Sequence, residues 1–166
     1  MFKNEATLHL LVGKISAGKS TLASKLGRSP ATVVISEDEW LATLFGEEMH
    51  SVSDYVRFSS RLRLAMEPHL ISLLQSDISV VLDFAANTVD ARAWMREVFE
   101  KADCDHRLHF LDVPDDVCRA RLCRRNAVGD HPFTVSDEQF DFITGHFVAP
   151  SAEERFQVIT YRHDES

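Results

Sequence analysis

The residues from Gly13 to Ser20 combine two glycines, a lysine and a serine at a spacing suited to holding an anion. They read Gly-Lys-Ile-Ser-Ala-Gly-Lys-Ser, which fits the pattern Gly-x-x-x-x-Gly-Lys-Ser/Thr. Gly13 and Gly18 stand where a Cβ would obstruct the turn or the close approach of backbone to ligand. Lys19 can place its charge on the β- and γ-phosphates, and Ser20 can offer its hydroxyl to Mg²⁺. The pattern therefore predicts a phosphate-binding loop for a nucleoside triphosphate.

We expect the backbone N–H groups of this loop, and the start of the helix behind it, to hold the phosphates. A helix N-terminus carries unpaired N–H groups and partial positive charge. The residues predicted to bind nucleotide are Gly13, Lys14, Ser16, Ala17, Gly18, Lys19, Ser20 and Thr21. The alternative is a glycine-rich turn with an incidental lysine, which the apolar strand before the loop and the helix after it disfavour.

Three acids, Glu37, Asp38 and Glu39, follow the strand predicted at residues 32–36. Ligands bind at the carboxyl ends of the strands in an open α/β sheet, and we expect this strand to lie next to the first one. Asp38 is the predicted catalytic base, because a carboxylate there can accept the proton of a hydroxyl that attacks the γ-phosphorus. The alternative is that the acids cap a helix that begins near Trp40.

An aspartate also closes the third predicted strand, where the sequence reads Val80-Val81-Leu82-Asp83. In proteins with such a loop, an aspartate at this point orders Mg²⁺ or its waters. Ser20 and Asp83 are therefore the predicted metal-binding residues. The alternative is an aspartate that only serves a turn at the strand end.

Arginines gather in one predicted helix of this acidic chain, at Arg119, Arg121, Arg124 and Arg125. Arginine stays charged and grips two oxygens of a transferred phosphoryl group with its planar fork. Arg121 and Arg125 lie one helical turn apart and are the predicted catalytic arginines. The alternative is a solvated basic face that pairs with local acids. The polar segment 126–135 that follows is expected to be a mobile lid.

A second pair of arginines, Arg92 and Arg96, is predicted to lie on one face of another helix. This pair either contacts substrate or forms ion pairs with Asp90 and Glu100.

The elements that must position these residues alternate along the chain. Strands are predicted at 7–12, 32–36, 79–84, 107–113 and 157–161, and helices at 19–26, 54–75, 90–101, 115–125 and 136–145. The strands are almost continuously apolar, which predicts a parallel five-stranded sheet covered by helices on both faces. Pro68 is expected to kink the second helix or to start a new one. Without a linker or repeat, residues 1–166 are predicted to form a single α/β domain with a lid at about 115–135.

The composition restricts the environment and the partners of this domain. The chain has 166 residues, a net charge of −8 and a pI near 5.4. The acidic balance argues against a nucleic acid partner, which would need a broad basic surface. No apolar run approaches the length of a membrane span and no cleavable signal precedes the first strand, so a soluble, cytoplasmic protein is expected. The three cysteines suggest neither disulfides nor a zinc site, and the eight scattered histidines are expected at the surface or half-buried.

With these residues in order, the sequence resembles the P-loop kinases that phosphorylate small molecules or polynucleotide 5′ ends. Residues 33–38 are similar to the strand and base of polynucleotide 5′-hydroxyl kinases and of chloramphenicol phosphotransferase, which implies that Asp38 is the base. Residues 83–96 are similar to gluconate kinases, whose arginines match Arg92 and Arg96. The lid and the motif after it are matched by Arg121, Arg125, His131, Phe133, Phe147, Pro150 and Glu154. The resemblance implies a nucleoside monophosphate kinase-like P-loop fold that uses ATP and Mg²⁺.

The sequence departs from this family at two kinds of position. Leu41 stands where polynucleotide kinases carry an arginine three residues after the base, which argues against an oligonucleotide acceptor. Lys14 is an extra cation in the loop, which either contacts phosphate or faces solvent. On the acceptor side, the residues that match no known member are Trp40, Phe45, Tyr55 and Arg57.

These observations predict an ATP-dependent kinase that transfers the γ-phosphoryl group to a hydroxyl of a small molecule. The alternatives are a nucleotide-binding regulatory ATPase without such an acceptor, a polynucleotide 5′-hydroxyl kinase and a kinase-like toxin that acts on a nucleotide sugar. The acceptor, the preference for ATP over GTP and the oligomeric state are left open by the sequence.

Overall fold

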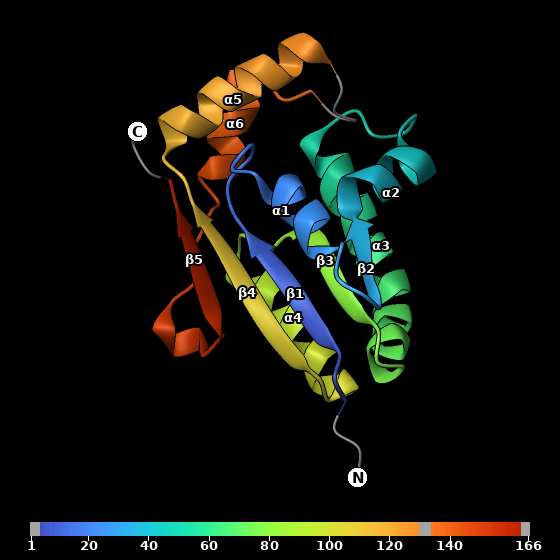
Figure 1. Ribbon diagram of the computed structural model, residues 1–166. Coiled ribbons are helices and arrows are strands. Elements are labelled where there is room, and N and C mark those ends of the chain that lie inside the picture. The colour runs from blue at the N-terminus through green and yellow to red at the C-terminus, as the bar shows by residue number, and fades with distance from the viewer. Residues whose placement is uncertain (1–3, 130–133, 164–166) are drawn as a thin grey trace.

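A five-stranded parallel sheet forms the centre of the protein (Figure 1). A computed structural model describes residues 4–129 and 134–163. The strands are β1 (Thr7–Val12), β2 (Thr32–Ser36), β3 (Ser79–Ala85), β4 (Asp105–Asp112) and β5 (Val158–Arg162). They lie in the order β2-β3-β1-β4-β5, and each neighbouring pair is parallel. The predicted parallel five-stranded sheet is therefore confirmed.

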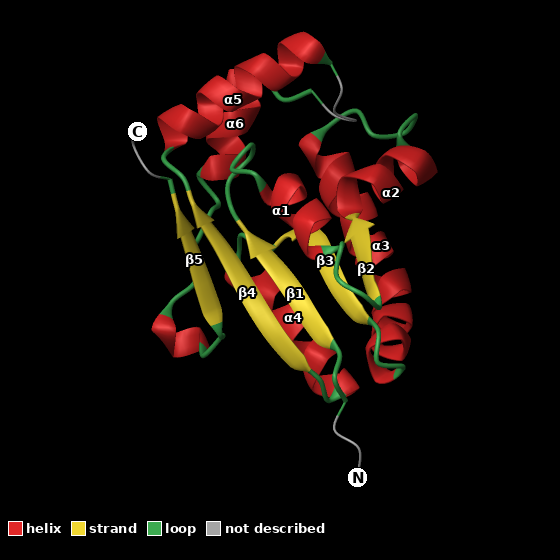
Figure 2. Ribbon diagram, in the orientation of Figure 1, coloured by secondary structure: helices red, strands yellow, loops and turns green. Residues whose placement is uncertain are grey.

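Six α-helices and one 3₁₀ turn are found in the described part of the chain (Figure 2). They are α1 (Lys19–Leu26), α2 (Glu37–Phe45), α3 (Val52–Gln75), α4 (Val89–Ala102), α5 (Asp115–Val128), α6 (Asp137–Thr144) and the turn at Ala152–Glu154. Helix α1 lies on one face of the sheet, and α4 lies on the other (Figure 1). Helices α5 and α6 lie beyond the carboxyl ends of the strands. Among the residues described, no helix combines the length and apolarity that crossing a membrane requires.

Alternating side chains of the strands supply two separate apolar layers. Leu8 and Leu10 of β1 point into the larger layer, which α3 and α4 complete. Leu11 points to the other face and packs with Ala23 of α1 and Val81 of β3. A third cluster seats α5 and α6 against the loop after β1, and it contains Ala17, Val113, Cys118, Leu122 and Phe140. The loop is therefore held between the sheet and the last two helices.

The strand order differs from the expected one, because β3 lies between β1 and β2. The expectation that β2 neighbours β1 was wrong. The interior of β3 is almost fully buried, so it occupies a central position, whereas Val33 and Val34 of β2 are about two-fifths exposed. Strand β5 is exposed along its whole length. The prediction that the strands are covered on both faces is therefore correct for the central strands and wrong for the edge strands β2 and β5.

The helices follow the predicted pattern with local differences. Helix α3 continues through Pro68, so no new helix starts there. Its proline is exposed, so the hydrogen bond that the ring cannot donate is missing on the solvent side of the helix. Gly27 ends α1 as predicted, but its φ of −67° is helical and not left-handed. A side chain is excluded at this position because Val34 of β2 lies too close.

The segment expected as a lid is partly helical. Helix α5 extends to Val128 and ends at Gly129, whose φ of 75° is left-handed. Ser136 caps α6, and its capping box with Gln139 is formed as the sequence predicted. His131, Pro132 and Phe133 lie outside the described residues.

Candidate active site

The loop between β1 and α1 has the backbone geometry that its glycines were predicted to serve. A Cβ on Gly13 would lie 3.1 Å from the Cβ of Ala17 and 3.4 Å from Cγ of Lys19, so a side chain there would crowd the loop. Gly18 has a φ of 108° and stands at the N-cap of α1. Ser16 is also left-handed, with a φ of 62°. The loop therefore turns back tightly on itself before the helix begins.

The ammonium of Lys19 lies inside this loop. Its Nζ donates to the carbonyl oxygens of Gly13, at 2.5 Å, and of Lys14, at 2.9 Å. Burial lowers the pKa of Lys19 to about 8, while the nearby carboxylates of Asp83 and Asp38 act in the opposite direction. Two acids from different elements, Asp83 in β3 and Asp38 in α2, thus act on the cation that was predicted to bind the phosphates.

Ser20 and Asp83 meet as the sequence predicted for a metal site. Ser20 Oγ donates to Asp83 Oδ2 at 2.9 Å. Within residues 4–129 and 134–163, no group of three or more histidine, cysteine or acidic side chains could hold a metal ion by itself. A hydroxyl beside a carboxylate at the phosphate loop fits Mg²⁺, which binds oxygen and commonly takes its other ligands from phosphate and water.

The three acids after β2 have different surroundings. Glu37 is buried, with 3% of its surface exposed, whereas Asp38 is half-buried and Glu39 is exposed. Ser36 is the N-cap of α2, and its side chain accepts from the backbone N–H of Glu39 at 3.4 Å. The helix therefore begins at Glu37 instead of near Trp40, and the acids occupy its first turn. The interpretation of the acids as caps was wrong, because a serine already takes that position.

Helix α3 holds the buried Glu37. Tyr55 Oη lies 3.1 Å from Glu37 Oε1, the hydroxyl of Ser59 donates to the same oxygen, and Arg63 forms an ion pair with Oε2 at 3.3 Å. This cluster was not predicted from the sequence. The signal was the spacing of four residues from Tyr55 to Ser59 to Arg63, which puts these side chains on one face of a helix.

Tyr55 also connects Glu37 to Asp38. Its hydroxyl lies 3.3 Å from Asp38 Oδ1. Burial raises the pKa of Tyr55 well above its ordinary value, and the charges of Glu37 and Asp38 raise it further. Tyr55 is therefore a neutral hydrogen-bond donor to a pair of carboxylates, one of which is the predicted base.

The arginines of α5 separate into two groups. Arg119 lies near the surface, where it pairs with Asp141 at 2.6 Å and with Asp137 at 3.6 Å, as the solvated interpretation predicted. Arg121 turns toward the loop and donates to the carbonyl oxygens of Ser16 and Ala17 at 3.5 and 3.3 Å. The charge of Arg125 lowers the pKa of Lys19, so this arginine also acts on the loop lysine.

The side chain of Lys14 extends from the loop toward α5. Its Nζ lies 2.5 Å from Asp115 Oδ1 in the first turn of α5, and 5.4 Å from the centre of the Phe147 ring. The ammonium thus joins the loop to α5 instead of facing open solvent, and its contact with phosphate stays a prediction. Its carbonyl oxygen still takes part in the loop by accepting from Lys19.

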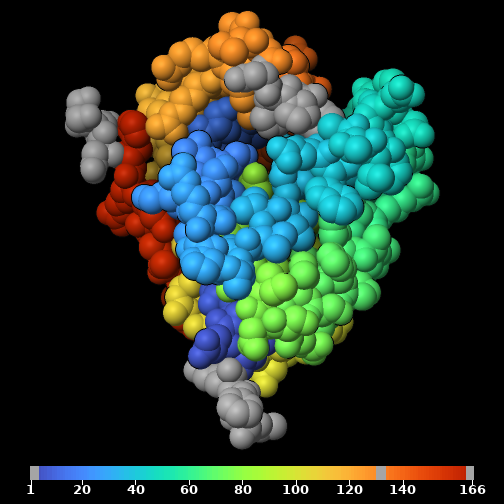
Figure 3. All heavy atoms as spheres, turned by 45° about the vertical axis from the view of Figure 1, so that its right-hand side comes forward, coloured from blue at the N-terminus to red at the C-terminus, as the bar shows by residue number. Residues whose placement is uncertain are grey.

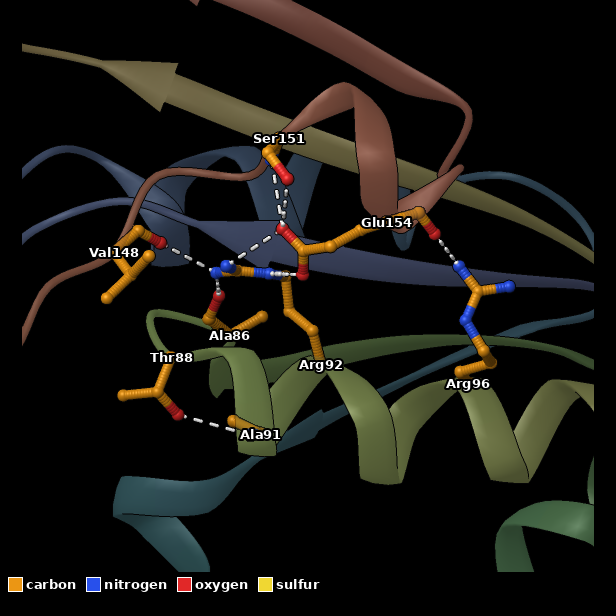
Figure 4. Close-up of polar contacts among 8 residues, drawn as sticks. All are labelled: Ala86, Thr88, Ala91, Arg92, Arg96, Val148, Ser151 and Glu154. Carbon is orange, nitrogen blue, oxygen red and sulfur yellow. Dashed lines mark hydrogen bonds and ion pairs between the residues drawn. The ribbon is translucent and has the colours of Figure 1, made fainter.

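The side chain of Arg92 is buried and cannot contact a substrate. It is fully buried and forms a bidentate pair with Glu154, at 2.8 and 3.2 Å, instead of pairing with Asp90 (Figure 4). Arg96 pairs with Glu100 at 3.6 Å, as one interpretation predicted, and also donates to the carbonyl oxygen of Glu154.

The three cysteines are free, as expected.

These groups surround the carboxyl ends of β1, β2 and β3. The space-filling view shows a hollow between α1 and α2, below α5 (Figure 3). In a parallel sheet of this order, the crevice beside β1 is where ligands bind. The sheet, the loop and its lysine define a P-loop nucleotide-binding domain with the fold of P-loop kinases.

The chain belongs to a family of P-loop domains described as an AAA domain, whose model matches residues 8–150. No curated protein sequence matches the chain.

Solved structures with the same fold include several kinases. A candidate kinase from Chloroflexus aurantiacus is 18% identical with a TM-score of 0.75, over 98% of this chain and 87% of that one. The APS kinase CysC of Mycobacterium tuberculosis, solved with AMPPNP and APS, is 19% identical with a TM-score of 0.62, over 98% and 91% of the chains. A chain of the Pnkp1/Rnl/Hen1 RNA repair complex is 20% identical with a TM-score of 0.69, over 87% of this chain and 45% of that one.

Proposed function

We propose that the protein is an ATP-dependent kinase that transfers the γ-phosphoryl group to a hydroxyl of a small molecule. The observation that carries this proposal is the meeting of three groups at one end of the sheet. The Lys19 ammonium lies in the loop, the Ser20–Asp83 pair lies beside it, and the Asp38 carboxylate acts on the same ammonium from a third element. A phosphate-binding loop alone would need no second carboxylate near its lysine.

The proposed reaction uses these groups in turn. Lys19 and the N–H groups of the loop hold the triphosphate, and Ser20 and Asp83 would hold Mg²⁺, which when bound neutralises charge on the phosphate oxygens. Asp38 accepts the proton of the acceptor hydroxyl as its oxygen bonds to the γ-phosphorus. The bond from that phosphorus to the β–γ bridging oxygen breaks, so ADP leaves with the bonding electron pair.

Arg121 and Arg125 are proposed to close over the transferred group. Arg121 contacts the loop and the charge of Arg125 acts on Lys19, so the fixed positive charge of both would stabilise the negative charge on the phosphoryl oxygens. On this proposal residues 1–166 act as one domain and 115–135 act as its lid, which excludes water when it closes.

Two observations favour a small acceptor over a polynucleotide end. Leu41 occupies the position at which the resembled polynucleotide kinases carry an arginine, and its side chain is fully buried, so it contacts no phosphate. The chain also carries a net charge of −8, which repels a polyanion.

The test is acceptor-dependent release of ADP across sugars, nucleosides, aminoglycosides and 5′-hydroxyl oligonucleotides. For an accepted substrate, we expect Asp38→Asn to lower kcat by about 10²- to 10⁴-fold with little change in ATP affinity. Glu39→Gln changes the exposed neighbour of Asp38 and is expected to keep the wild-type rate. Full activity of Asp38→Asn would instead support the regulatory ATPase, and turnover with oligonucleotides alone would support the polynucleotide kinase.

Lys19→Ala separates binding from transfer. This change removes the cation from the loop, so we expect loss of ATP binding or of turnover, measured by calorimetry and by ADP release. Unchanged affinity and turnover would remove the loop from the mechanism.

A further inference from the structure

The side chain of Asn87 forms two hydrogen bonds with the backbone of Gly13, the first residue of the phosphate loop. Asn87 Oδ1 accepts from the backbone N–H of Gly13 at 2.9 Å, and Asn87 Nδ2 donates to the carbonyl oxygen of Gly13 at 2.7 Å. The same carbonyl oxygen accepts from Lys19 Nζ at 2.5 Å. One oxygen atom therefore joins Asn87 to the cation of the site.

This contact extends the pairing of β1 with β3 past the end of both strands. The register between the two strands shifts after Leu10, and the backbone N–H of Ala86 then donates to the carbonyl oxygen of Leu11 at 3.0 Å. The next hydrogen bonds along β1 come from the Asn87 side chain. A carboxamide can make both of them, since it carries a donor and an acceptor, whereas a carboxylate carries acceptors alone.

The backbone of Asn87 is itself held by the segment that follows α6. Its carbonyl oxygen accepts from the N–H of Val148 at 2.8 Å, and the carbonyl oxygen of Val148 accepts from Arg92 Nη1, also at 2.8 Å. Arg92 Nη1 donates to Ala86 as well, and the guanidinium is clamped by Glu154 (Figure 4). A continuous series of hydrogen bonds thus runs from Glu154 to Gly13.

We propose that Asn87 is a positioning residue of the nucleotide site, which sets the Gly13 peptide and through it the Lys19 ammonium. The inference rests on the nucleotide binding in the proposed function, but not on any particular acceptor. Glycine has more backbone freedom than other residues, so a loop that begins with one needs restraint from outside. Asn87 supplies that restraint on both polar atoms of Gly13, and the buried Arg92 keeps Asn87 in place.

A second asparagine provides a matched control. Asn4 Oδ1 accepts from the N–H of Ala6 at 2.9 Å, and Asn4 Nδ2 donates to the carbonyl oxygen of Ala102 at 3.4 Å. Asn4 therefore makes the same kinds of contact near the start of β1, at the end of the strand away from the loop. Asn4→Ala removes comparable hydrogen bonds without touching Gly13.

The experiment measures ATP affinity by calorimetry, with Mg²⁺ present, for the wild type and for Asn87→Ala, Asn87→Asp and Asn4→Ala. We expect Asn87→Ala to weaken ATP binding by about tenfold, since two hydrogen bonds to Gly13 are lost. Amide hydrogen exchange of Gly13 should become faster in this variant and stay unchanged in Asn4→Ala. Asn4→Ala should lower the melting temperature while ATP affinity remains that of the wild type.

Each outcome decides the proposal. Wild-type affinity in Asn87→Ala, or equal weakening in Asn4→Ala, would overturn the positioning role. If Asn87→Ala does not fold, Asn87→Asp decides, since it keeps the shape but loses the donor to Gly13; unchanged affinity overturns the proposal. A wild-type protein that binds no ATP or GTP overturns both proposals, whereas binding without turnover on any acceptor overturns the kinase alone.

Discussion

At the scale of single residues, the most informative group is the Lys19 ammonium, which two backbone carbonyl oxygens of the loop hold. Burial lowers the pKa of Lys19 to about 8 against the attraction of Asp83 and Asp38. A bound polyanion should raise the pKa of this lysine, because added negative charge favours its protonated form.

Nucleotide binding should therefore take up protons in mildly alkaline solution. At about pH 8.5 the free protein holds Lys19 partly deprotonated, and bound triphosphate raises the pKa, so a proton is taken up; near pH 7 the lysine is already charged and uptake is small. Calorimetric titrations with ATP in buffers of different ionisation enthalpy measure the number of protons. A binding enthalpy that is independent of the buffer at both pH values would contradict this prediction.

At the scale of elements, α3 shows how packing overrides a local preference. The helix passes through Pro68, although proline removes a backbone hydrogen bond inside a helix. Its buried side recurs every four residues, with Phe58, Leu62, Met66, Leu70 and Leu74. Burial of this apolar face against the sheet and α4 stabilises the helix enough to tolerate the proline.

Replacing that proline should stabilise the protein. Pro68 is exposed, so Pro68→Ala removes no buried contact and restores a donor to the helix. We expect the free energy of unfolding to rise by about 1–3 kcal/mol, measured by urea denaturation. Pro30→Ala alters a proline outside the helices and should be neutral or slightly destabilising. A loss of stability in Pro68→Ala would show that the helix depends on the proline.

At the scale of the whole molecule, a polar row links three strands across the sheet. His9 Nδ1 lies 2.9 Å from His109 Nε2, and His109 Nδ1 lies 2.8 Å from Tyr161 Oη. His109 is buried, against the expectation that the histidines are at most half-buried, because its strand lies between β1 and β5. Burial lowers the pKa of His109 to about 4, and the charges of His9 and Arg107 act in the same direction.

The sheet should therefore lose stability in mild acid. Between pH 6.5 and about 4 the unfolded chain binds a proton at residue 109 that the folded protein excludes, so the free energy of unfolding falls as the pH falls. Urea denaturation at several pH values in this window measures the slope. His109→Gln should flatten the slope, whereas His69→Gln, at an exposed position of α3, should leave it nearly unchanged. Equal slopes in the wild type and His109→Gln would contradict the prediction.

The sequence by itself was sufficient for features that depend on near neighbours. The bounds of β1, β2 and α1 were predicted as found, because apolar runs, caps and glycines act over a few residues. The phosphate loop was recognised for the same reason, since its glycines, lysine and serine lie within eight positions. The roles of Asp38, Arg121 and Arg125 remain predictions that the proposed experiments test.

Only the tertiary structure decided which distant residues meet. It placed β3 between β1 and β2, paired Arg92 with Glu154, and brought Asn87 to Gly13. Partners separated by some 60 residues or more leave no periodic trace in a sequence, because their contact depends on strand order and on how the helices pack. The phosphate loop could therefore be predicted from the sequence. The long-range contacts that hold the loop in place form only when the sheet assembles.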